Sequence, residues 1–433
     1  MLDIKFIRQN PDKVKDALLA RGTKFDLEAF LALDEKRRTL QRQVEDLAAK
    51  QNKIDKEIQK LLQDKKDPKP KIAESKSIKE EIAAIEGKFN ELDKQLKEGL
   101  DRIPNIPHCS LPVGGAAKNK IVRESGILRS FDFKTSDHIT LAEHLDIIDF
   151  KRAAKITGSN FLLFKGKGAQ LERALINFML DLHTGQHQYT EIFPAKLVNR
   201  QSMRATGQLP NLEEDMYCLK DEDLFLIPTA EVPVTNIYRD EVLEEEQLPV
   251  YYVAYTPCFR REAGSYGKDT RGLSRVHEFD KVEMVKFVKP ENSYDELEKL
   301  LDNACSVLDL LKIPYRVVIL ATGDLSFAAA KCYDIEIYAP GVDKWLEVSS
   351  CSNFEDFQAR RANIKYRTKT IPVGEPGVNR KPKTEYVHTL NGSGVALARL
   401  VAALLENYQE KDGSVTIPEV LRKYMNGLER MVR

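Results

Sequence analysis

Within the stretch from Thr256 to Phe287 of this sequence, five cationic side chains lie on or beside a predicted glycine-rich loop. They are Arg260, Arg261, Lys268, Arg271 and Arg275. Such groups suit a polyanion such as ATP, because charge-assisted hydrogen bonds to phosphate oxygens are strong. A solvated surface hairpin is the simpler interpretation of a charge-rich loop. However, carboxylates are interleaved with the cations at strand positions, which would be costly in an ordinary packed hairpin; they are Glu262, Glu278, Asp280 and Glu283.

Two strands are predicted to position these charges. Val282, Met284, Val285 and Phe287 are typical of a buried strand, and Pro257–Arg260 predicts an earlier one. The segment between them contains Gly264, Gly267 and Gly272, which allow backbone geometries that side chains forbid. The pattern predicts a hairpin whose rigid strands aim the cations and whose loop closes over a ligand.

Two further stretches could contribute polar groups. Thr229, Ala230 and Glu231 follow an apolar strand pattern, and a carboxylate with a hydroxyl there would suit an ammonium group. A helix N-cap formed by Thr229 is an equally good interpretation. Arg399 lies in a strongly apolar helix pattern after Gly392 and Gly394. A buried cation needs an anion, but an arginine that extends from a core helix to solvent would also fit.

The motifs themselves resemble a known family. Phe259-Arg260-x-Glu262, followed by AGSYGKDTRGL and HEFDKVEM, is similar to motif 2 of seryl-tRNA synthetases, which are class II aminoacyl-tRNA synthetases. The resemblance covers nearly the whole chain, with motif 1 at about 169–194, motif 2 at about 256–287 and motif 3 at about 390–409. It implies an α+β fold: a long antiparallel coiled-coil hairpin, then a catalytic domain with an antiparallel β-sheet flanked by helices. The family usually has Gly where this chain has Ser326, Ala328 and Ala398.

The resemblance implies ATP as a substrate. Arg260 is expected to hold the α-phosphate and the amino-acid carboxylate, and Glu262 to orient Arg260 and the base. Phe279 is expected to stack on adenine, while Arg399 covers its other face and reaches the γ-phosphate, and Arg275 assists on the pyrophosphate side. Arg260, Glu262, Arg275 and Arg399 are thus the catalytic candidates. The full ATP-binding set is Arg260, Arg261, Glu262, Val276, Phe279, Glu347, Val348, Ser349, Ser350 and Arg399.

The amino acid and the metal follow from the same resemblance. L-Serine is expected to contact Thr229, Ala230, Glu231, Arg260, Glu283, Asn391 and Ser393. Glu347 and Ser350 resemble the family's metal-facing pair, and oxygen ligands suit Mg²⁺, which usually keeps most of its waters. One Glu and one Ser would be weak evidence alone.

Residues 1–103 are predicted to form a helical arm. Asn10-Pro11-Asp12 indicates a helix start. Two heptad seams then follow within about 26–103: Leu40, Val44, Leu47, Gln51, Ile54, Ile58 and Leu61, then Ile78, Ile82, Ile85, Phe89, Leu92, Leu96, Gly99 and Ile103. Pro68 and Pro70 are expected to interrupt the helix between them. Residues 104–124, rich in Pro and Gly, are expected to link the arm to a catalytic domain at 125–433.

In that domain, Phe161–Phe164 is expected to form a strand. Ala169–His183 is expected to form an amphipathic helix whose apolar face consists of Leu171, Leu175, Phe178, Met179 and Leu182.

The tip of this predicted hairpin is basic. Between residues 50 and 79 there are ten lysines and five acidic residues, a local net charge of +5. A dimerisation coiled coil with a soluble tip is one interpretation. The other is a reader of a phosphate backbone, and the family resemblance implies the long variable arm of tRNA(Ser), with tRNA(Sec) left open. The tip candidates are Lys53, Lys56, Lys60, Lys65, Lys66, Lys69 and Lys71.

Composition adds few constraints. Lys+Arg and Asp+Glu both total 67, so the net charge is zero. A nucleic-acid partner can therefore be predicted only from a local basic patch. The start has no apolar signal region and no stretch is long enough for a membrane span. The six cysteines are scattered, which predicts reduced thiols in a cytoplasmic protein. Homodimerisation rests on the resemblance alone.

Three function hypotheses follow. The first is a seryl-tRNA synthetase, an ATP-dependent, AMP-forming serine–tRNA ligase. The second is a synthetase-like paralogue that binds an amino acid or carrier without charging tRNA, which should lack the arm or a phosphate-handling arginine. The third is a structural coiled-coil protein with an inert globular head. This hypothesis does not explain the five cations and the carboxylates around one predicted hairpin.

Overall fold

The computed structural model describes residues 1–263, 272–368 and 383–433. Gly264, Gly267, Lys268 and Arg271 of the predicted loop lie outside these ranges. The chain divides into two compact units: one comprises Leu2–Leu19 and Thr23–Pro104, and the other comprises Asn105–Arg433 with Met1 and Ala20–Gly22. Within the described ranges, no helix is long and apolar enough to cross a membrane.

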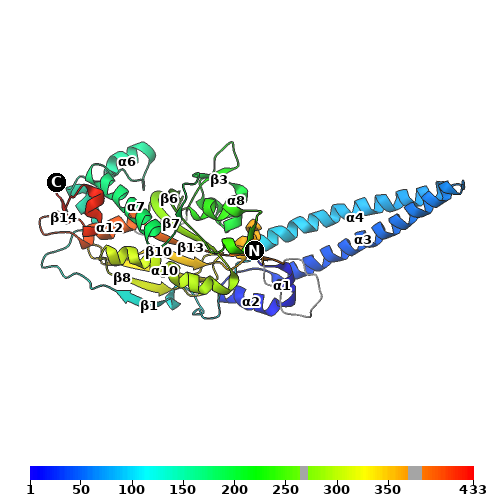
Figure 1. Cartoon of the computed structure of the whole chain (residues 1–433), viewed down its shortest axis with the longest axis horizontal. Helices are drawn as coiled ribbons and strands as arrows, with labels where there is room; N and C mark the ends of the chain where they lie inside the picture. Colours follow the sequence, from blue (N-terminus) through cyan, green and yellow to red (C-terminus); the bar gives the residue numbers. More distant parts are fainter. Residues whose placement is uncertain (264–271, 369–382) are drawn as a thin grey trace. The chain divides into compact units, whose positions relative to one another are not determined.

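The first unit contains the predicted helical hairpin. Its helices are α1 (Ile4–Gln9), α2 (Pro11–Ala20), α3 (Leu27–Gln63) and α4 (Lys69–Arg102), and α3 and α4 run side by side in opposite directions (Figure 1). Every position of both predicted seams is buried or half-buried, so the heptad prediction is confirmed. The proline prediction was wrong for Pro70. Pro68 caps α4 and Pro70 lies in its first turn, where the missing N–H would have no helical partner anyway.

The second unit is built on an eight-stranded sheet in the order β1-β8-β9-β10-β13-β7-β6-β2. All neighbours pair antiparallel except β2 and β6. The strands are β1 (Lys120–Ser125), β2 (Thr190–Glu191), β6 (Val250–Phe259), β7 (Glu278–Val288), β8 (Tyr315–Ile319), β9 (Lys331–Ala339), β10 (Lys344–Asn353) and β13 (His388–Ala396). Because β1 pairs with β8, the end of the segment expected to be a linker belongs to this sheet.

Three helices cover the sheet. Helix α7 (Lys167–Gly185) packs on β6, α10 (Ser293–Leu310) on β10 and β13, and α12 (Leu397–Asn407) on β9 and β10. Of these, α12 is buried on all sides except at Arg399. The predicted apolar face of α7 is fully buried. Shorter helices are α5 (His138–His144), α6 (Phe150–Thr157), α8 (Arg200–Thr206), α9 (Glu231–Thr235), α11 (Phe357–Ala362) and α13 (Glu419–Arg422).

Small sheets complete the second unit. They consist of β3 (Leu197–Asn199) with β4 (Leu224–Leu226), of β5 (Val242–Glu244) with β11 (Lys365–Arg367) and β12 (Thr384–Tyr386), and of β14 (Val415–Thr416) with β15 (Arg430–Met431). The strand predicted at Phe161–Phe164 was wrong. Only one bridge forms there, between Ile148 and Phe164, because no partner strand runs alongside the rest of this apolar stretch.

The strand predictions that matter for the site are confirmed, with longer strands than expected. Val282, Met284, Val285 and Phe287 of β7 have no exposed surface. β7 lies between β6 and β13, and Glu283 stands directly opposite Ser393 of β13. The predicted motif 2 and motif 3 segments are therefore neighbours in the sheet.

Candidate active site

A cavity of about 770 Å³ opens where β7, β9, β10, β13 and α12 meet. Of the residues predicted to bind ATP, serine or metal, all line this cavity except Arg261 and Ala230. Arg261 is exposed and its backbone N–H donates to Asp215, while Ala230 is fully buried in a neighbouring core cluster. Ser326, Ala328 and Ala398 also line the cavity.

Alternation along β7 explains how polar groups reach the cavity. Successive side chains of a strand point to opposite faces, so Phe279, Lys281 and Glu283 face the cavity, while Val282 and Met284 lie in the hydrophobic core. The guanidinium carbon of Arg260 lies 5.2 Å from the centroid of the Phe279 ring. Because Arg260 directly follows the last residue of β6, the end of this strand places a cation beside an aromatic face.

The remaining arginines are held by specific partners. Arg275 Nη1 donates to Glu262 Oε2 at 2.9 Å. Arg399 donates from Nε to the carbonyl of Ser274 at 3.1 Å and from Nη1 to the carbonyl of Glu347 at 2.7 Å. Arg399 thus points into the cavity from α12 and joins the motif 2 segment to β10, which excludes the interpretation of a side chain that merely extends to solvent.

A second group of polar side chains forms a carboxylate cluster on the same cavity. Glu231 and Glu283 are 9% and 2% exposed, and burial, with the Glu283 carboxylate as a smaller cause, raises the pKa of Glu231 to about 7. Gln358 Nε2 donates to Glu231 Oε1 at 2.6 Å. Lys281 forms an ion pair with Glu283 and donates to Thr229 Oγ1 at 2.9 Å. The cluster therefore offers two carboxylates and one ammonium group in a desolvated place.

Thr229 does not act as a simple helix cap. The N-cap of α9 is Ala230, without a side-chain cap bond, while Thr229 Oγ1 accepts the N–H of Glu231 at 3.2 Å as well as the Lys281 ammonium. The sequence reasoning missed Lys281 and Gln358. The alternation Phe279-x-Lys281-x-Glu283 was a usable signal for Lys281, since it places all three on one strand face. No signal pointed to Gln358, which reaches the site from α11.

The predicted metal-facing pair is part of a larger oxygen cluster. Ser350 Oγ donates to Asp334 Oδ1 at 2.6 Å and also lies 3.2 Å from Glu347 Oε1, within hydrogen-bond reach of both carboxylates. Burial, and then the Glu347 carboxylate, raises the pKa of Asp334 to about 7. A divalent cation would relieve the repulsion between these carboxylates, so the residues fit Mg²⁺. Within the described part of the chain no group of three or more His, Cys, Asp or Glu could hold a metal, and two carboxylates with a hydroxyl leave room for waters and phosphate oxygens.

Asp334 was also missed. It lies on β9 directly opposite Ser350 on β10, so it enters the cluster through strand register rather than through a motif of its own.

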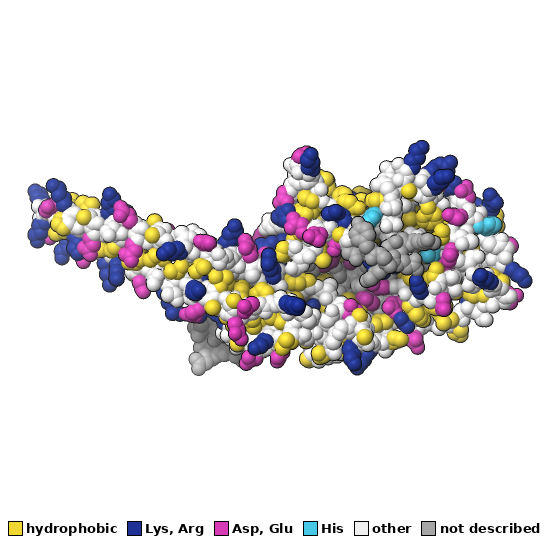
Figure 2. Space-filling model, turned by 180° about the vertical axis from the view of Figure 1, so that it is seen from behind, with side chains coloured by type: hydrophobic (Ala, Val, Ile, Leu, Met, Phe, Trp, Pro, Cys, Tyr) yellow, Lys and Arg dark blue, Asp and Glu magenta, His cyan; other side chains and the backbone are white. Residues whose placement is uncertain are grey.

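The basic residues of the hairpin tip lie in the first unit. Figure 2 shows Lys side chains gathered around the end of the α3–α4 hairpin. Six of the seven predicted tip lysines are exposed. Lys71 differs, because it is bound to Glu57 and Glu74 at 3.0 Å each. The exposed six are Lys53, Lys56, Lys60, Lys65, Lys66 and Lys69.

Two family models match this chain. Residues 1–107 match the seryl-tRNA synthetase N-terminal domain, and residues 217–408 match the core domain of class II tRNA synthetases for G, H, P, S and T. Together they include the hairpin and every cavity segment from β6 to α12. The match therefore extends over both compact units.

Full-length relatives agree with these models. A serine–tRNA ligase of Thermodesulfovibrio yellowstonii is 54% identical over 98% of this chain and 99% of its own. The crystal structure of a seryl-tRNA synthetase from Pyrococcus horikoshii, complexed with ATP, has a TM-score of 0.90 and 40% identity over 100% of this chain and 99% of its own. A cytoplasmic serine–tRNA ligase from Naegleria fowleri, in complex with AMP, has a TM-score of 0.86 and 27% identity over 100% and 99% of the two chains. The chain therefore belongs to the seryl-tRNA synthetase family of class II aminoacyl-tRNA synthetases.

Proposed function

We propose that this chain activates L-serine with ATP and transfers the serine to the 3′ end of tRNA(Ser). In the first step the serine carboxylate attacks the α-phosphorus and pyrophosphate leaves. In the second step a ribose hydroxyl of the tRNA attacks the adenylate carbonyl and AMP leaves. The observation that carries this proposal is one cavity lined both by phosphate-suited arginines and by a buried carboxylate cluster. Neither step needs a protein nucleophile, so alignment and charge neutralisation are the tasks of the protein.

At the nucleotide, we assign roles to three arginines, to Phe279 and to Glu262. Arg260 binds the α-phosphate and the serine carboxylate, and its place beside the Phe279 ring suits a phosphate next to a stacked adenine. Arg399 covers the other face of the adenine and reaches the γ-phosphate. Arg275, oriented by Glu262, neutralises charge on the pyrophosphate side. These donors are positioned before the reaction, which is where electrostatic stabilisation is most effective.

At the serine, Glu231, Glu283 and Thr229 receive the ammonium and hydroxyl groups, with Asn391 and Ser393 alongside. Among the residues that the structure describes, these two carboxylates face one protein ammonium group, Lys281, so a second positive charge from the substrate completes the balance. Alanine would leave buried polar groups unpaired, whereas threonine must be excluded by lack of room for its methyl group.

Mg²⁺ would be held by Glu347 and Ser350, with Asp334 bonded to Ser350. When bound, it supplies charge stabilisation for the phosphate oxygens. Ser350 and the two carboxylates supply oxygen ligands or orient them, and Arg399 holds the strand of Glu347 in place through its carbonyl.

The remaining assignments concern partners. The exposed tip lysines bind the phosphate backbone of the long variable arm of tRNA(Ser), and tRNA(Sec) is a second acceptor to be tested. The chain works as a homodimer through the α7 region, in the cytoplasm.

Pyrophosphate exchange into ATP, measured without tRNA for each of the twenty amino acids, tests the adenylation step. We expect exchange with serine alone. Exchange with another amino acid would refute the serine pocket. A folded protein that binds ATP but exchanges with none would favour the paralogue without charging activity.

A further inference from the structure

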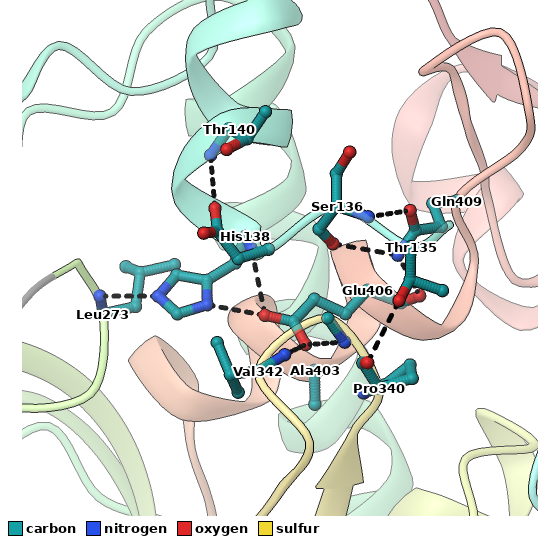
Figure 3. A network of polar contacts seen from close by, with 12 residues as sticks. Thr135, Ser136, His138, Thr140, Leu273, Pro340, Val342, Ala403, Glu406 and Gln409 are labelled. Atoms are coloured by element: carbon teal, nitrogen blue, oxygen red, sulfur yellow. Dashed lines mark hydrogen bonds and ion pairs between the residues drawn. The ribbon is translucent and has the colours of Figure 1, made fainter. Parts of the chain in front are cut away.

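A buried histidine and glutamate, His138 and Glu406, contact each other in a polar network (Figure 3). Neither residue lines the cavity. His138, at the start of α5, is 2% exposed, and Glu406, near the end of α12, is fully buried. The Glu406 carboxylate accepts four N–H groups. They are the backbone N–H of His138 at 2.9 Å, its Nδ1 at 2.7 Å, and the backbone N–H groups of Gly341 at 2.7 Å and Val342 at 3.2 Å.

The other ring nitrogen of His138 fixes a segment of motif 2. The backbone N–H of Leu273 donates to His138 Nε2 at 3.3 Å, so Nε2 must carry its lone pair. The proton then lies on Nδ1 and is donated to Glu406, which assigns the tautomer from the two partners. The chain of contacts therefore runs from α12 through Glu406 and His138 to the backbone of Leu273.

The same helix holds the next residue of this segment. Arg399, also on α12, donates to the carbonyl of Ser274. Leu273 is thus held by α12 indirectly, through His138 and Glu406, and Ser274 directly, through Arg399. Arg275 and Val276, which follow at once, line the cavity. The path and direction of the chain at Arg275 are consequently set by α12.

Two glycines allow the close approaches that this arrangement requires. Gly272 has φ of +68°, and a Cβ there would lie 2.5 Å from His138 Nε2 and 2.6 Å from Ile139 Cγ1. A Cβ on Gly341 would lie 2.2 Å from the carbonyl oxygen of Ser136. Both backbones pack against the segment around His138 at distances that no other residue permits.

The segment before His138 is also bound to α12 and its end. Gln409 accepts the N–H of Ser136 at 2.8 Å and donates to its carbonyl at 3.0 Å. Thr135 Oγ1 donates to the carbonyl of Pro340 at 3.1 Å. His138 therefore projects toward Leu273 from a backbone that is fixed on both sides.

We propose that His138 and Glu406 are positioning residues for ATP: they hold the backbone of Leu273 so that Arg275 and Val276 face the nucleotide. This inference rests on the proposed function, because it assigns the nucleotide to that wall of the cavity. It predicts that losing the acceptor at Nε2 weakens ATP binding selectively, whereas serine binding at Glu231 and Glu283 is preserved.

The test compares His138→Leu, which removes the acceptor, with His138→Gln, whose amide oxygen restores one near the position of Nε2. ATP affinity by calorimetry and the KM values for ATP and serine are measured for each. We expect His138→Leu to weaken ATP binding by roughly tenfold, since a buried N–H loses its partner. His138→Gln should recover most of this loss, and the KM for serine should stay within about twofold in both.

Asn407→Ala is the matched control. Asn407 is next to Glu406, 6% exposed, and donates to the carbonyls of Tyr338 and Ala403. It should lower thermal stability without a selective effect on ATP. The proposal is overturned if His138→Leu raises both KM values equally, as a general loss of stability would, or if His138→Gln is no better than His138→Leu.

Gly272→Ala keeps the proposal testable if His138→Leu does not fold. A Cβ on residue 272 would push against His138 Nε2 and so separate it from the Leu273 N–H. This variant should reproduce the ATP-selective defect, whereas unchanged ATP affinity would contradict the proposal. ATP binding to the wild-type protein is measured directly. A failure of serine exchange would therefore count against the proposed function, while the ATP affinities of the variants still decide this inference.

Discussion

Arg399 Nη1 donates to the backbone carbonyl of Glu347 at 2.7 Å. This bond joins α12 to strand β10, 52 residues earlier in the chain. The same guanidinium also binds the carbonyl of Ser274. One side chain thereby fixes the helix, the proposed metal-bearing strand and the motif 2 segment around one cavity.

Arg399→Ala should reduce kcat/KM for ATP in serine-dependent pyrophosphate exchange by about a hundredfold or more, because it removes a preorganised cation and two backbone contacts. The KM for serine should change much less. Arg123→Ala is the control. Arg123 lies on the outer strand β1 and forms an ion pair with Asp302, away from the cavity. Equal losses in both variants would contradict a specific role for Arg399.

Glu283→Ala should reduce serine-dependent exchange more than tenfold, because Glu283 balances the buried Lys281 beside the proposed ammonium site. ATP affinity should survive, which calorimetry checks. Glu278→Ala, at the exposed start of the same strand, should leave both substrates unaffected. Unchanged serine kinetics in Glu283→Ala would show that the pocket is assigned wrongly.

Glu231 predicts a pH dependence. Its pKa is raised from 4.5 to about 7, by burial first and then by Glu283. A raised carboxyl pKa favours folding while the group is protonated, so this contribution is complete below about pH 4.5 and is lost as pH rises through about 7. In the absence of serine, wild-type protein should therefore lose thermal stability between pH 6 and 8 relative to Glu231→Gln.

Serine should oppose this loss, because its ammonium group pairs with the charged form of Glu231. Serine affinity, measured by calorimetry without ATP, should rise from pH 6 to pH 8 with release of a proton. The rise should be absent in Glu231→Gln. A pH-independent affinity in the wild-type protein would contradict the proposed contact.

Much of this site could be predicted from local sequence. The charges around Arg260, the alternation of β7 and the heptad seams are local patterns, and the strands and helices that carry them formed as predicted. Asp334 and Gln358 could not be found this way, because Asp334 reaches the cavity through strand register and Gln358 reaches Glu231 from a separate short helix. The role of His138 could not be predicted for the same reason, because its partners Leu273 and Glu406 are 135 and 268 residues away in the chain. The strand predicted at Phe161–Phe164 failed because apolar residues alone do not supply a pairing partner.

The basic hairpin tip predicts that lysine substitutions there weaken tRNA binding in a salt-dependent way and leave serine activation unchanged. Replacing Lys65, Lys66 and Lys69 together by Ala should raise the KM for tRNA(Ser) and reduce the slope of affinity against salt, because fewer counterions are released from the phosphates. Exchange without tRNA should be unchanged. The matched control replaces Lys36, Lys88 and Lys94, which are exposed farther along the hairpin. Equal effects of the two triple variants would contradict recognition by the tip.

The most direct test of the central claim is the attachment of radiolabelled serine to tRNA by the wild-type protein. We predict that tRNA(Ser) becomes charged, that removing its variable arm abolishes charging, and that other tRNAs with short variable arms stay uncharged. A protein that exchanges pyrophosphate with serine but charges no tRNA would contradict the account and identify the chain as a serine-activating relative without synthetase activity.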